Sequence, residues 1–157
     1  MVKPRDAARV LLIDDRERAL LFRYHNPFQG HTFWVPPGGG LDAGENHRAA
    51  AVRELAEETG RDDIDIGPEI WRRDHTFRWG TRKLRQRERW FLATTPAFEV
   101  PRAVVQSLAR EGVEEARWWS VDEMLHTDAL LTPRRLGTLL PPILAGEIPE
   151  VPVDVGI

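Results

Sequence analysis

Apolar residues along the chain form short runs separated by polar turns. The runs "AARVLLI" (residues 7–13) and "ALLFRY" (residues 19–24) flank the polar stretch "DDRER", a pattern that predicts a β-hairpin. A third apolar run, "HTFWV" (residues 31–35), ends at Pro36-Pro37 and three glycines. The first part of the chain is therefore predicted to form three short strands followed by a glycine-rich turn.

A change from alternating to helical spacing marks the next element, which is predicted as a helix over residues 47–59. Asn46 stands where a helix N-cap is expected, and Gly60 stands where a glycine ends a helix. Two strand-like segments follow, over residues 64–77 and 83–95. In the second, side chains alternate between two faces. One face carries Leu84, Gln86, Glu88, Trp90 and Leu92, and the other carries Arg85, Arg87, Arg89, Phe91 and Ala93.

The last third of the chain is less regular. We expect a short helix over residues 101–111, a strand over 117–120, and a short helix from Ser120, whose spacing to Glu123 is that of a capping box. A further helix is predicted to start at the cap Thr132. In that helix Pro133 takes the first position, Pro141-Pro142 interrupt or restart it, and Gly146 ends it before an extended tail.

Composition narrows the class of protein. The 157 residues are 41% hydrophobic and 30% charged, with no repeat or linker, which predicts one soluble globular domain over residues 1–157. No apolar run approaches the roughly 20 residues of a membrane span. Cysteine is absent, which excludes disulfides, thiolate zinc sites and cysteine nucleophiles, and fits a cytoplasmic protein. Any metal must be held by oxygen or imidazole ligands.

Charge is unevenly distributed. The chain carries a net charge of −3, but the segment from Trp71 to Trp90 has eight basic and two acidic residues and is therefore +6. Such a segment can attract an anionic ligand. From charge alone, a solvated hairpin with outward-facing arginines is the simpler interpretation.

The predicted helix carries three glutamates on one face. Glu54, Glu57 and Glu58 stand at positions i, i+3 and i+4, where like charges repel. Carboxylates clustered without imidazole or thiolate suit Mg²⁺ or Mn²⁺ better than zinc. The helix taken alone is better explained as a solvated glutamate-rich surface. The preceding glycines change this balance, because glycine turns and helix N-termini present backbone N–H groups to phosphate. Loop and helix together predict phosphate bound through a divalent metal.

The spacing of these residues is specific. Gly39 is followed after five residues by Glu45, and after seven more by Arg53-Glu54-Leu55-Ala56-Glu57-Glu58-Thr59-Gly60. This arrangement resembles the Nudix box of the Nudix (MutT-type) hydrolases. It departs from the box at its last position, where Arg61 replaces an aliphatic residue. The resemblance covers residues 39–61 and extends more loosely to the order of strands and helices.

The resemblance implies an α/β (α+β) fold, an α/β/α sandwich with a mixed central sheet and a glycine loop leading into a catalytic helix. It implies a divalent-metal-dependent pyrophosphohydrolase, using Mg²⁺ or Mn²⁺, that cleaves a nucleoside diphosphate linked to another moiety by attack of water at phosphorus. Two alternatives stay open: a nucleotide-sensing binding module without catalysis, and a pyrophosphohydrolase of RNA 5′ ends. No membrane partner is implied, and members of the family are often homodimers.

Carried onto this chain, the resemblance assigns roles residue by residue. The metal ligands would be Glu54, Glu57, Glu58 and the backbone of Gly39, with Arg53 and Glu45 pairing across the loop to orient the catalytic helix. One of the three glutamates would act as the base. Substrate contacts are expected from Gly38, Gly40, Arg85, Arg87, Arg89 and Trp34. A further acid or base is sought among Glu88, Glu111, Glu114 and Glu115.

Overall fold

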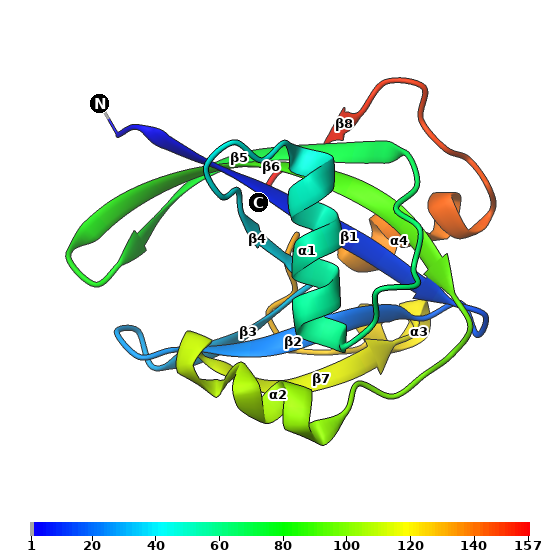
Figure 1. The fold of residues 1–157 in the computed structure, drawn as a ribbon, viewed down its shortest axis with the longest axis horizontal. Coiled ribbons are helices and arrows are strands. Elements are labelled where there is room, and N and C mark those ends of the chain that lie inside the picture. The colour runs from blue at the N-terminus through cyan, green and yellow to red at the C-terminus, as the bar shows by residue number, and fades with distance from the viewer. Residues whose placement is uncertain (1) are drawn as a thin grey trace.

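The computed structural model describes residues 2–157, and its framework is an eight-stranded mixed sheet (Figure 1). Six strands follow the order β3-β2-β1-β6-β5-β8, while β4 pairs with β1 and β7 pairs with β2. The strands are β1 (Pro4–Asp14), β2 (Ala19–Asn26), β3 (His31–Val35), β4 (Gly38–Gly40), β5 (Glu69–Trp79), β6 (Arg82–Thr95), β7 (Val113–Trp119) and β8 (Val153–Asp154).

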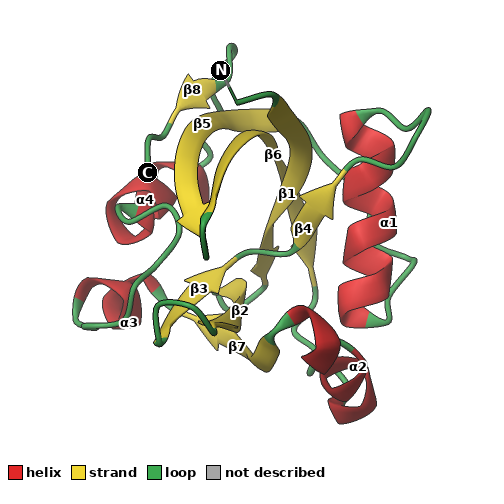
Figure 2. Ribbon diagram, turned by 90° about the vertical axis from the view of Figure 1, so that its left-hand side faces the viewer, coloured by secondary structure: helices red, strands yellow, loops and turns green. Residues whose placement is uncertain are grey.

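Helices cover both faces of this sheet, as Figure 2 shows. One apolar core joins α1 and α2 to one face, and a second joins α3 and α4 to the other. The expected α/β/α layers around a mixed sheet are therefore confirmed. The helices are α1 (His47–Thr59), α2 (Arg102–Ser107), α3 (Val121–Leu125) and α4 (Leu136–Leu144), with a 3₁₀ turn, η1 (Ala109–Glu111), after α2.

Strand β1 pairs with β6 on one side and with two different strands, β4 and β2, on its other side. It runs parallel to β6 over its whole length, but pairs with β2 only next to the hairpin turn. Nearer its start, the same strand pairs with β4. The three glycines were predicted to form a turn, and this prediction was wrong because their backbone is extended against β1. Gly38 has a φ of 149°, and a Cβ there would lie 2.1 Å from the Ala8 carbonyl oxygen, so only glycine permits this approach.

The bounds and the caps of helix α1 follow the sequence prediction. The Asn46 side chain accepts a hydrogen bond from the Ala49 N–H at 2.8 Å, and Gly60 ends the helix with a left-handed φ of 74°. Ala50, Ala51 and Leu55 pack against the sheet. The alternation predicted for β6 is also confirmed, since Trp90 and Leu92 join the core under α4 while Phe91 and Ala93 join the core under α1.

The prediction of a helix beginning at Thr132 and Pro133 was wrong. The Thr132 N–H donates to the Trp34 carbonyl oxygen at 3.0 Å, which ties this residue to β3, and the Thr132–Pro133 bond is cis. Helix α4 starts at Leu136 and continues through Pro141-Pro142. The two prolines were predicted to interrupt or restart the helix and do not, and beyond them the Ala145 N–H donates to the Pro141 carbonyl.

Two strand boundaries also differ from prediction. Strand β5 starts at Glu69, later than residue 64, and β7 starts at Val113, earlier than residue 117. The capping box at Ser120 is confirmed. The tail pairs with β5 through β8, in parallel orientation. No helix among residues 2–157 is long and apolar enough to cross a membrane.

Candidate active site

The site is built around a buried glutamate at the end of α1. Glu58 is 2% exposed, and its Oε1 accepts a hydrogen bond from the Gly38 N–H at 3.0 Å. Its Oε2 is buried with no hydrogen-bond partner. Burial and the neighbouring Glu54 carboxylate raise the pKa of Glu58 well above its usual value, while Arg9 acts in the opposite direction. The structure therefore leaves an incompletely satisfied carboxylate oxygen inside the protein.

Glu54 lies against the second glycine of β4. A Cβ at Gly39 would lie 2.6 Å from Glu54 Oε1, so the backbone and this carboxylate approach more closely than any other residue would allow. The expected anion cradle of free glycine N–H groups takes another form, because the Gly38 N–H already donates to Glu58. Strand β4 thus holds two carboxylates of α1 in place.

Arg53 connects the loop after β4 to α1. Its Nε and Nη2 donate to both Glu45 carboxylate oxygens at 2.9 and 2.8 Å, and Nη2 also donates to the Gly40 carbonyl at 3.0 Å. Hydrogen bonds from Arg53 and from the Asp42 N–H lower the pKa of Glu45 to about 2. The same guanidinium contacts Glu54 at 3.0 Å. This pairing across the loop is the arrangement that the resemblance implies.

Glu57 stands apart from the other two glutamates. Its side chain is 57% exposed and lies 3.5 Å from Arg53 Nη1. Among residues 2–157, no three acidic or imidazole side chains converge closely enough to enclose a cation as they stand. The site nevertheless fits a divalent cation, because Glu58 Oε2 lacks a partner beside Glu54 and hard oxygen ligands are what such ions require. A rotation of the exposed Glu57 side chain would complete the set.

Glu88 belongs to a different cluster, on the opposite face of β1 and β6 from α1. It is 2% exposed, and both of its oxygens accept two hydrogen bonds. The four donors are Arg9 Nε (3.2 Å), Gln86 Nε2 (2.7 Å), Arg73 Nη1 (3.0 Å) and Trp90 Nε1 (3.2 Å). Although burial acts to raise it, Arg9, Arg73 and these hydrogen bonds lower the pKa of Glu88 to about 2. A carboxylate held in this way is unsuited to accept a proton near neutral pH.

Sequence reasoning missed Arg9 and Arg73 as partners of Glu88. The sequence did indicate that Arg9 is buried, because it shares an inward face of β1 with Ala7 and Leu11. An unpaired charge is costly at such a position. Glu88 likewise shares its strand face with Trp90. Two buried charges of opposite sign indicate that each needs a partner, but the sequence does not show that β1 and β6 are neighbours.

The later glutamates occupy two environments. Glu114 and Glu115, on β7, form ion pairs with Arg23 at 3.5 and 3.0 Å. Glu111, in η1, is exposed. Burial raises the pKa of the Tyr24 phenol, a residue that the sequence did not indicate; the carboxylates of Glu58, Glu111 and Glu54 act in the same direction, and Arg9 acts against them.

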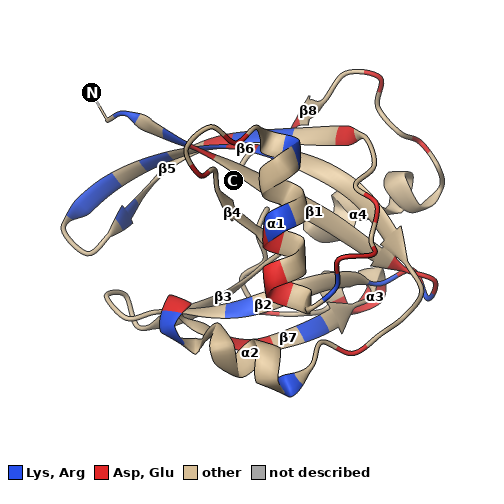
Figure 3. Cartoon of the chain, in the orientation of Figure 1, with Lys and Arg blue, Asp and Glu red and all other residues tan. Residues whose placement is uncertain are grey.

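The three arginines predicted as phosphate contacts lie on the face of β6 that also carries α1. Each contacts a carboxylate: Arg85 binds Asp74 through two hydrogen bonds, Arg87 contacts Asp6 at 3.1 Å, and Arg89 lies 3.8 Å from Glu69. Figure 3 shows basic residues along β5 and β6, and acidic residues on the C-terminal half of α1. The structure does not bring these arginines into hydrogen-bond contact with the α1 glutamates.

Trp34 is buried in the core beneath α3 and α4. Its ring packs edge to face against Trp119, with centroids 5.1 Å apart, and Arg23 lies over it. Stacked aromatic pairs occur elsewhere, on the two hairpins: Tyr24 with Phe33 at 5.7 Å, and His75 with Phe77 at 5.1 Å. These rings are better placed than Trp34 to meet a flat ligand.

Arg61, the residue that departs from the box, has a clear structural role. Its guanidinium lies 4.4 Å from the ring centroid of Phe98 and 3.7 Å from Asp63. The Arg61 N–H donates to the Thr59 hydroxyl. The aliphatic part and charge of arginine therefore replace the packing that an aliphatic residue would give at the helix end.

Comparison with known proteins places these observations in a family. The sequence profile of the NUDIX domain matches residues 3–139. An RNA pyrophosphohydrolase of Erythrobacter litoralis is 39% identical over 71 residues, which are 38% of this chain and 43% of that protein. Nudix hydrolase 26 (chloroplastic) of Arabidopsis thaliana is 39% identical over 70 residues, 38% of this chain and 32% of that protein. The chain thus spans less than half the length of these two relatives.

Solved structures show the same fold. The MutT protein of Methanosarcina mazei Go1 superposes with a TM-score of 0.68 over 89% of this chain and 95% of that chain, at 18% identity. At this level of identity the likeness concerns the arrangement of sheet and helices.

Proposed function

The chain belongs to the Nudix family, and we propose on this premise that it is a divalent-metal-dependent pyrophosphohydrolase. Its substrate would be a nucleoside diphosphate linked to another moiety, such as a nucleoside triphosphate or a nucleotide sugar. The observation that carries the proposal is the unpartnered Glu58 Oε2 buried beside Glu54. A binding module without catalysis would have no need of a carboxylate that destabilises the protein until a cation arrives.

The residues divide into ligands and supports. Enzymes of this family generally use divalent metals; here Glu54, Glu58 and a rotated Glu57 would hold Mg²⁺ or Mn²⁺, with the Gly39 backbone beside them. Such an ion neutralises phosphate oxygens and lowers the pKa of a bound water. Arg53, by binding Glu45 and the Gly40 carbonyl, keeps the glycine strand and α1 in register.

Proton transfer from the attacking water would fall to an exposed carboxylate. Glu57, the third proposed ligand, is also the first candidate for the base, because its side chain is solvent-accessible. Glu111 is the second, because it is exposed in the turn after α2. Glu88 drops out of the proposal because its four hydrogen bonds and low pKa leave it no capacity to take a proton. Glu114 and Glu115 are engaged by Arg23.

A second candidate function is removal of pyrophosphate from RNA 5′ ends. It is favoured by the curated relatives, several of which are RNA pyrophosphohydrolases, and by the basic residues along β5 and β6 (Figure 3). The same active-site residues would serve both functions. The acidic net charge of −3 argues for few phosphate contacts beyond the 5′ end.

A substrate panel tests the proposal. The protein is incubated with Mg²⁺ or Mn²⁺ and nucleoside triphosphates, dinucleoside polyphosphates, nucleotide sugars, ADP-ribose or 5′-triphosphorylated RNA. Released phosphate is measured with and without added phosphatase. We expect turnover of at least one compound, abolished in Glu58→Gln and retained in Glu150→Gln, an exposed control. Tight metal-dependent nucleotide binding with no turnover would instead identify a sensor.

Location and assembly are part of the proposal. We place the enzyme in the cytoplasm, because it has no cysteine and its substrates are nucleotides of that compartment. A homodimer, common in the family, is tested by light scattering coupled to size-exclusion chromatography, which distinguishes a mass of 18.0 kDa from twice that value.

A further inference from the structure

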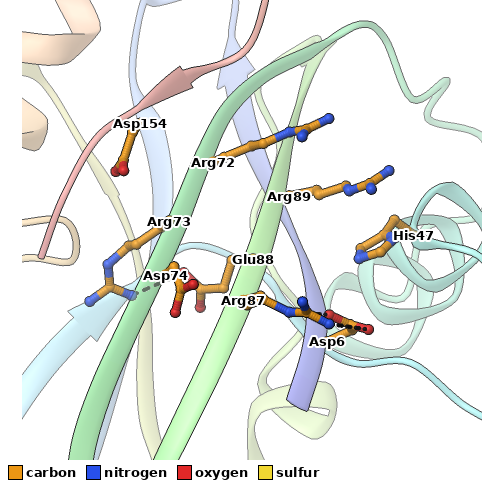
Figure 4. A pocket seen from close by; sticks show the side chains of 9 residues that line it. All are labelled: Asp6, His47, Arg72, Arg73, Asp74, Arg87, Glu88, Arg89 and Asp154. Atoms are coloured by element: carbon orange, nitrogen blue, oxygen red, sulfur yellow. Dashed lines mark hydrogen bonds and ion pairs between the residues drawn. The ribbon is translucent and has the colours of Figure 1, made fainter. Parts of the chain in front are cut away.

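A second polar cavity lies outside the carboxylate site. It has a volume of about 320 Å³ and lies between β5, β6 and the start of α1. Figure 4 shows the Arg72 and Arg89 side chains extending in parallel to the side of the strands on which His47, the first residue of α1, lies. The proposed chemistry uses none of these three residues.

The two arginines lack full charge compensation. Arg72 and Arg89 are directly opposite on β5 and β6, an arrangement in which like charges destabilise a sheet. They share one carboxylate, since Glu69 Oε1 lies 3.1 Å from Arg72 Nε and 3.8 Å from Arg89 Nε. Burial is the main cause that lowers the pKa of His47, and the charges of Arg89 and Arg72 act in the same direction, while Asp6 and Glu69 act against it.

The other carboxylates of the cavity are engaged elsewhere. Asp6 contacts Arg87 at 3.1 Å, and Asp74 binds Arg85, whose side chain lies outside the cavity lining. Asp154 accepts a hydrogen bond from the Gly156 N–H, and it lies on the other side of the cavity from the arginine tips in Figure 4. The Arg72–Arg89–His47 end of the cavity therefore has room and charge for an anion.

The position of this end relative to the glutamates suggests which anion. His47, Glu54 and Glu58 stand at positions i, i+7 and i+11, so they lie on one stripe of α1. Seven residues of helix separate His47 from Glu54 by about 10 Å. A nucleoside with its phosphates spans a comparable length. A phosphate beyond the nucleoside could therefore reach the arginines while the pyrophosphate lies at the glutamates.

We propose that Arg72, Arg89 and His47 form a second phosphate subsite, which binds a phosphate group separated by a nucleoside from the bond that is cleaved. The inference rests on the proposed function and narrows its substrate class. Arginine pairs suit this ligand because the planar guanidinium donates two parallel hydrogen bonds to phosphate oxygens. Such a phosphate occurs in the backbone of RNA and as the 3′-phosphate of a free nucleotide.

Three substrates separate these sources: ATP, ATP carrying a 3′-phosphate, and a 5′-triphosphorylated trinucleotide. In the double variant Arg72→Gln/Arg89→Gln, we expect the KM for both longer substrates to rise about tenfold or more, while ATP changes less than twofold. A rise for the trinucleotide alone would assign the subsite to an RNA backbone. A rise for 3′-phosphorylated ATP alone would assign it to a free nucleotide.

The matched control is Arg78→Gln/Lys83→Gln. These residues are also directly opposite on β5 and β6, are exposed, and lie outside the cavity. Equal effects of both double variants, or equal loss for ATP and the trinucleotide, would overturn the subsite in favour of general charge attraction. If the protein cleaves none of the three, whether or not another compound of the wider panel is a substrate, fluorescence polarisation of the labelled trinucleotide in Mg²⁺ tests the subsite independently of the proposed function. Unchanged affinity in Arg72→Gln/Arg89→Gln would then reject it.

Discussion

Two glutamates, Glu58 and Glu88, are buried to the same degree, 2% exposed, but have opposite surroundings. Glu58 accepts one hydrogen bond, and one of its oxygens has no partner. Glu88 has four partners that donate hydrogen bonds: Arg9, Arg73, Gln86 and Trp90. Burial raises the pKa of Glu58, whereas the donors and cations around Glu88 lower its pKa to about 2.

The difference distinguishes a carboxylate with a structural role, Glu88, from the one that we propose as a metal ligand, Glu58. An ionised carboxylate inside a protein needs positive charge and hydrogen-bond donors. Glu88 has both. Glu58 has fewer donors, and only Arg9 exerts a favourable charge effect on it. Arg9 therefore lies between the two groups, bonded to Glu88 and close enough to affect Glu58. We interpret the deficit at Glu58 as the place of an external cation.

The largest expected effect is on activity, in Glu58→Gln. Removing a metal ligand should lower kcat/KM on the order of a thousandfold, because the charge stabilisation that the cation gives to the phosphate is reduced. The free energy of unfolding without metal should stay equal or rise, since a poorly satisfied buried carboxylate is lost. Steady-state kinetics and urea unfolding measure the two effects. A large loss of stability with normal kcat/KM would reverse the roles assigned to Glu58 and Glu88.

Glu88→Gln should have the opposite profile. The substitution leaves Arg9 and Arg73 buried without their carboxylate, which should lower the free energy of unfolding by about 3–5 kcal/mol. Urea unfolding monitored by tryptophan fluorescence measures the loss. Turnover per folded molecule should fall far less than in Glu58→Gln, and this is measured at a temperature where the variant is folded. A stable but inactive variant would place Glu88 in the reaction.

The pH dependence of stability should differ in sign between the two groups. Because the folded pKa of Glu88 is about 2 against 4.5 unfolded, its contribution of roughly 3 kcal/mol is complete above pH 4.5 and is lost as pH falls toward 2. Glu58 has a raised folded pKa, so without metal the protein loses stability as pH rises from 4.5 through that value. Urea unfolding across pH tests this. In Glu88→Gln, the fall in unfolding free energy at acidic pH should become smaller. In Glu58→Gln, the fall above pH 4.5 should become smaller.

Divalent cations should stabilise the protein through Glu58. At a concentration of 100 times Kd, binding to the folded state adds about 2.7 kcal/mol to the free energy of unfolding. Thermal unfolding with MgCl₂ or MnCl₂, against NaCl of equal ionic strength, measures the shift in Tm. The shift should vanish in Glu58→Gln and persist in Glu150→Gln, an exposed control. A full shift in Glu58→Gln would move the cation site away from α1.

The sequence was informative where local spacing determines geometry. Asn46, Gly60 and the i, i+3, i+4 glutamates specify helix α1 and its carboxylate face without reference to the rest of the chain. The burial of Glu58 could not be read in the same way, because it depends on the pairing of β4 with β1. A prediction of three equivalent glutamates follows from spacing, while the structure separates exposed Glu57 from buried Glu58.

Long-range register explains the other gaps. The inward position of Arg9 was readable from alternation, but its partner was not, since only the parallel alignment of β1 with β6 brings it to Glu88. The same holds for Thr132, whose N–H donates to the Trp34 carbonyl on β3, so that this residue lies beside the sheet and helix α4 starts only at Leu136. In each case a contact between distant segments overrides a local signal.

The smallest expected effect tests whether Glu88 depends on each of its four hydrogen-bond donors. Gln86→Met removes one of its four donors, at 2.7 Å, with little change in volume. A hydrogen bond to a charged group contributes about 1.5–3 kcal/mol. Three donors remain in the variant, and two of them are arginines. We therefore expect the loss of unfolding free energy to lie at the lower end of that range. Urea unfolding measures it, with Gln106→Met on the exposed face of α2 as the control. A loss equal to that of Glu88→Gln would show that the four contacts act as one unit.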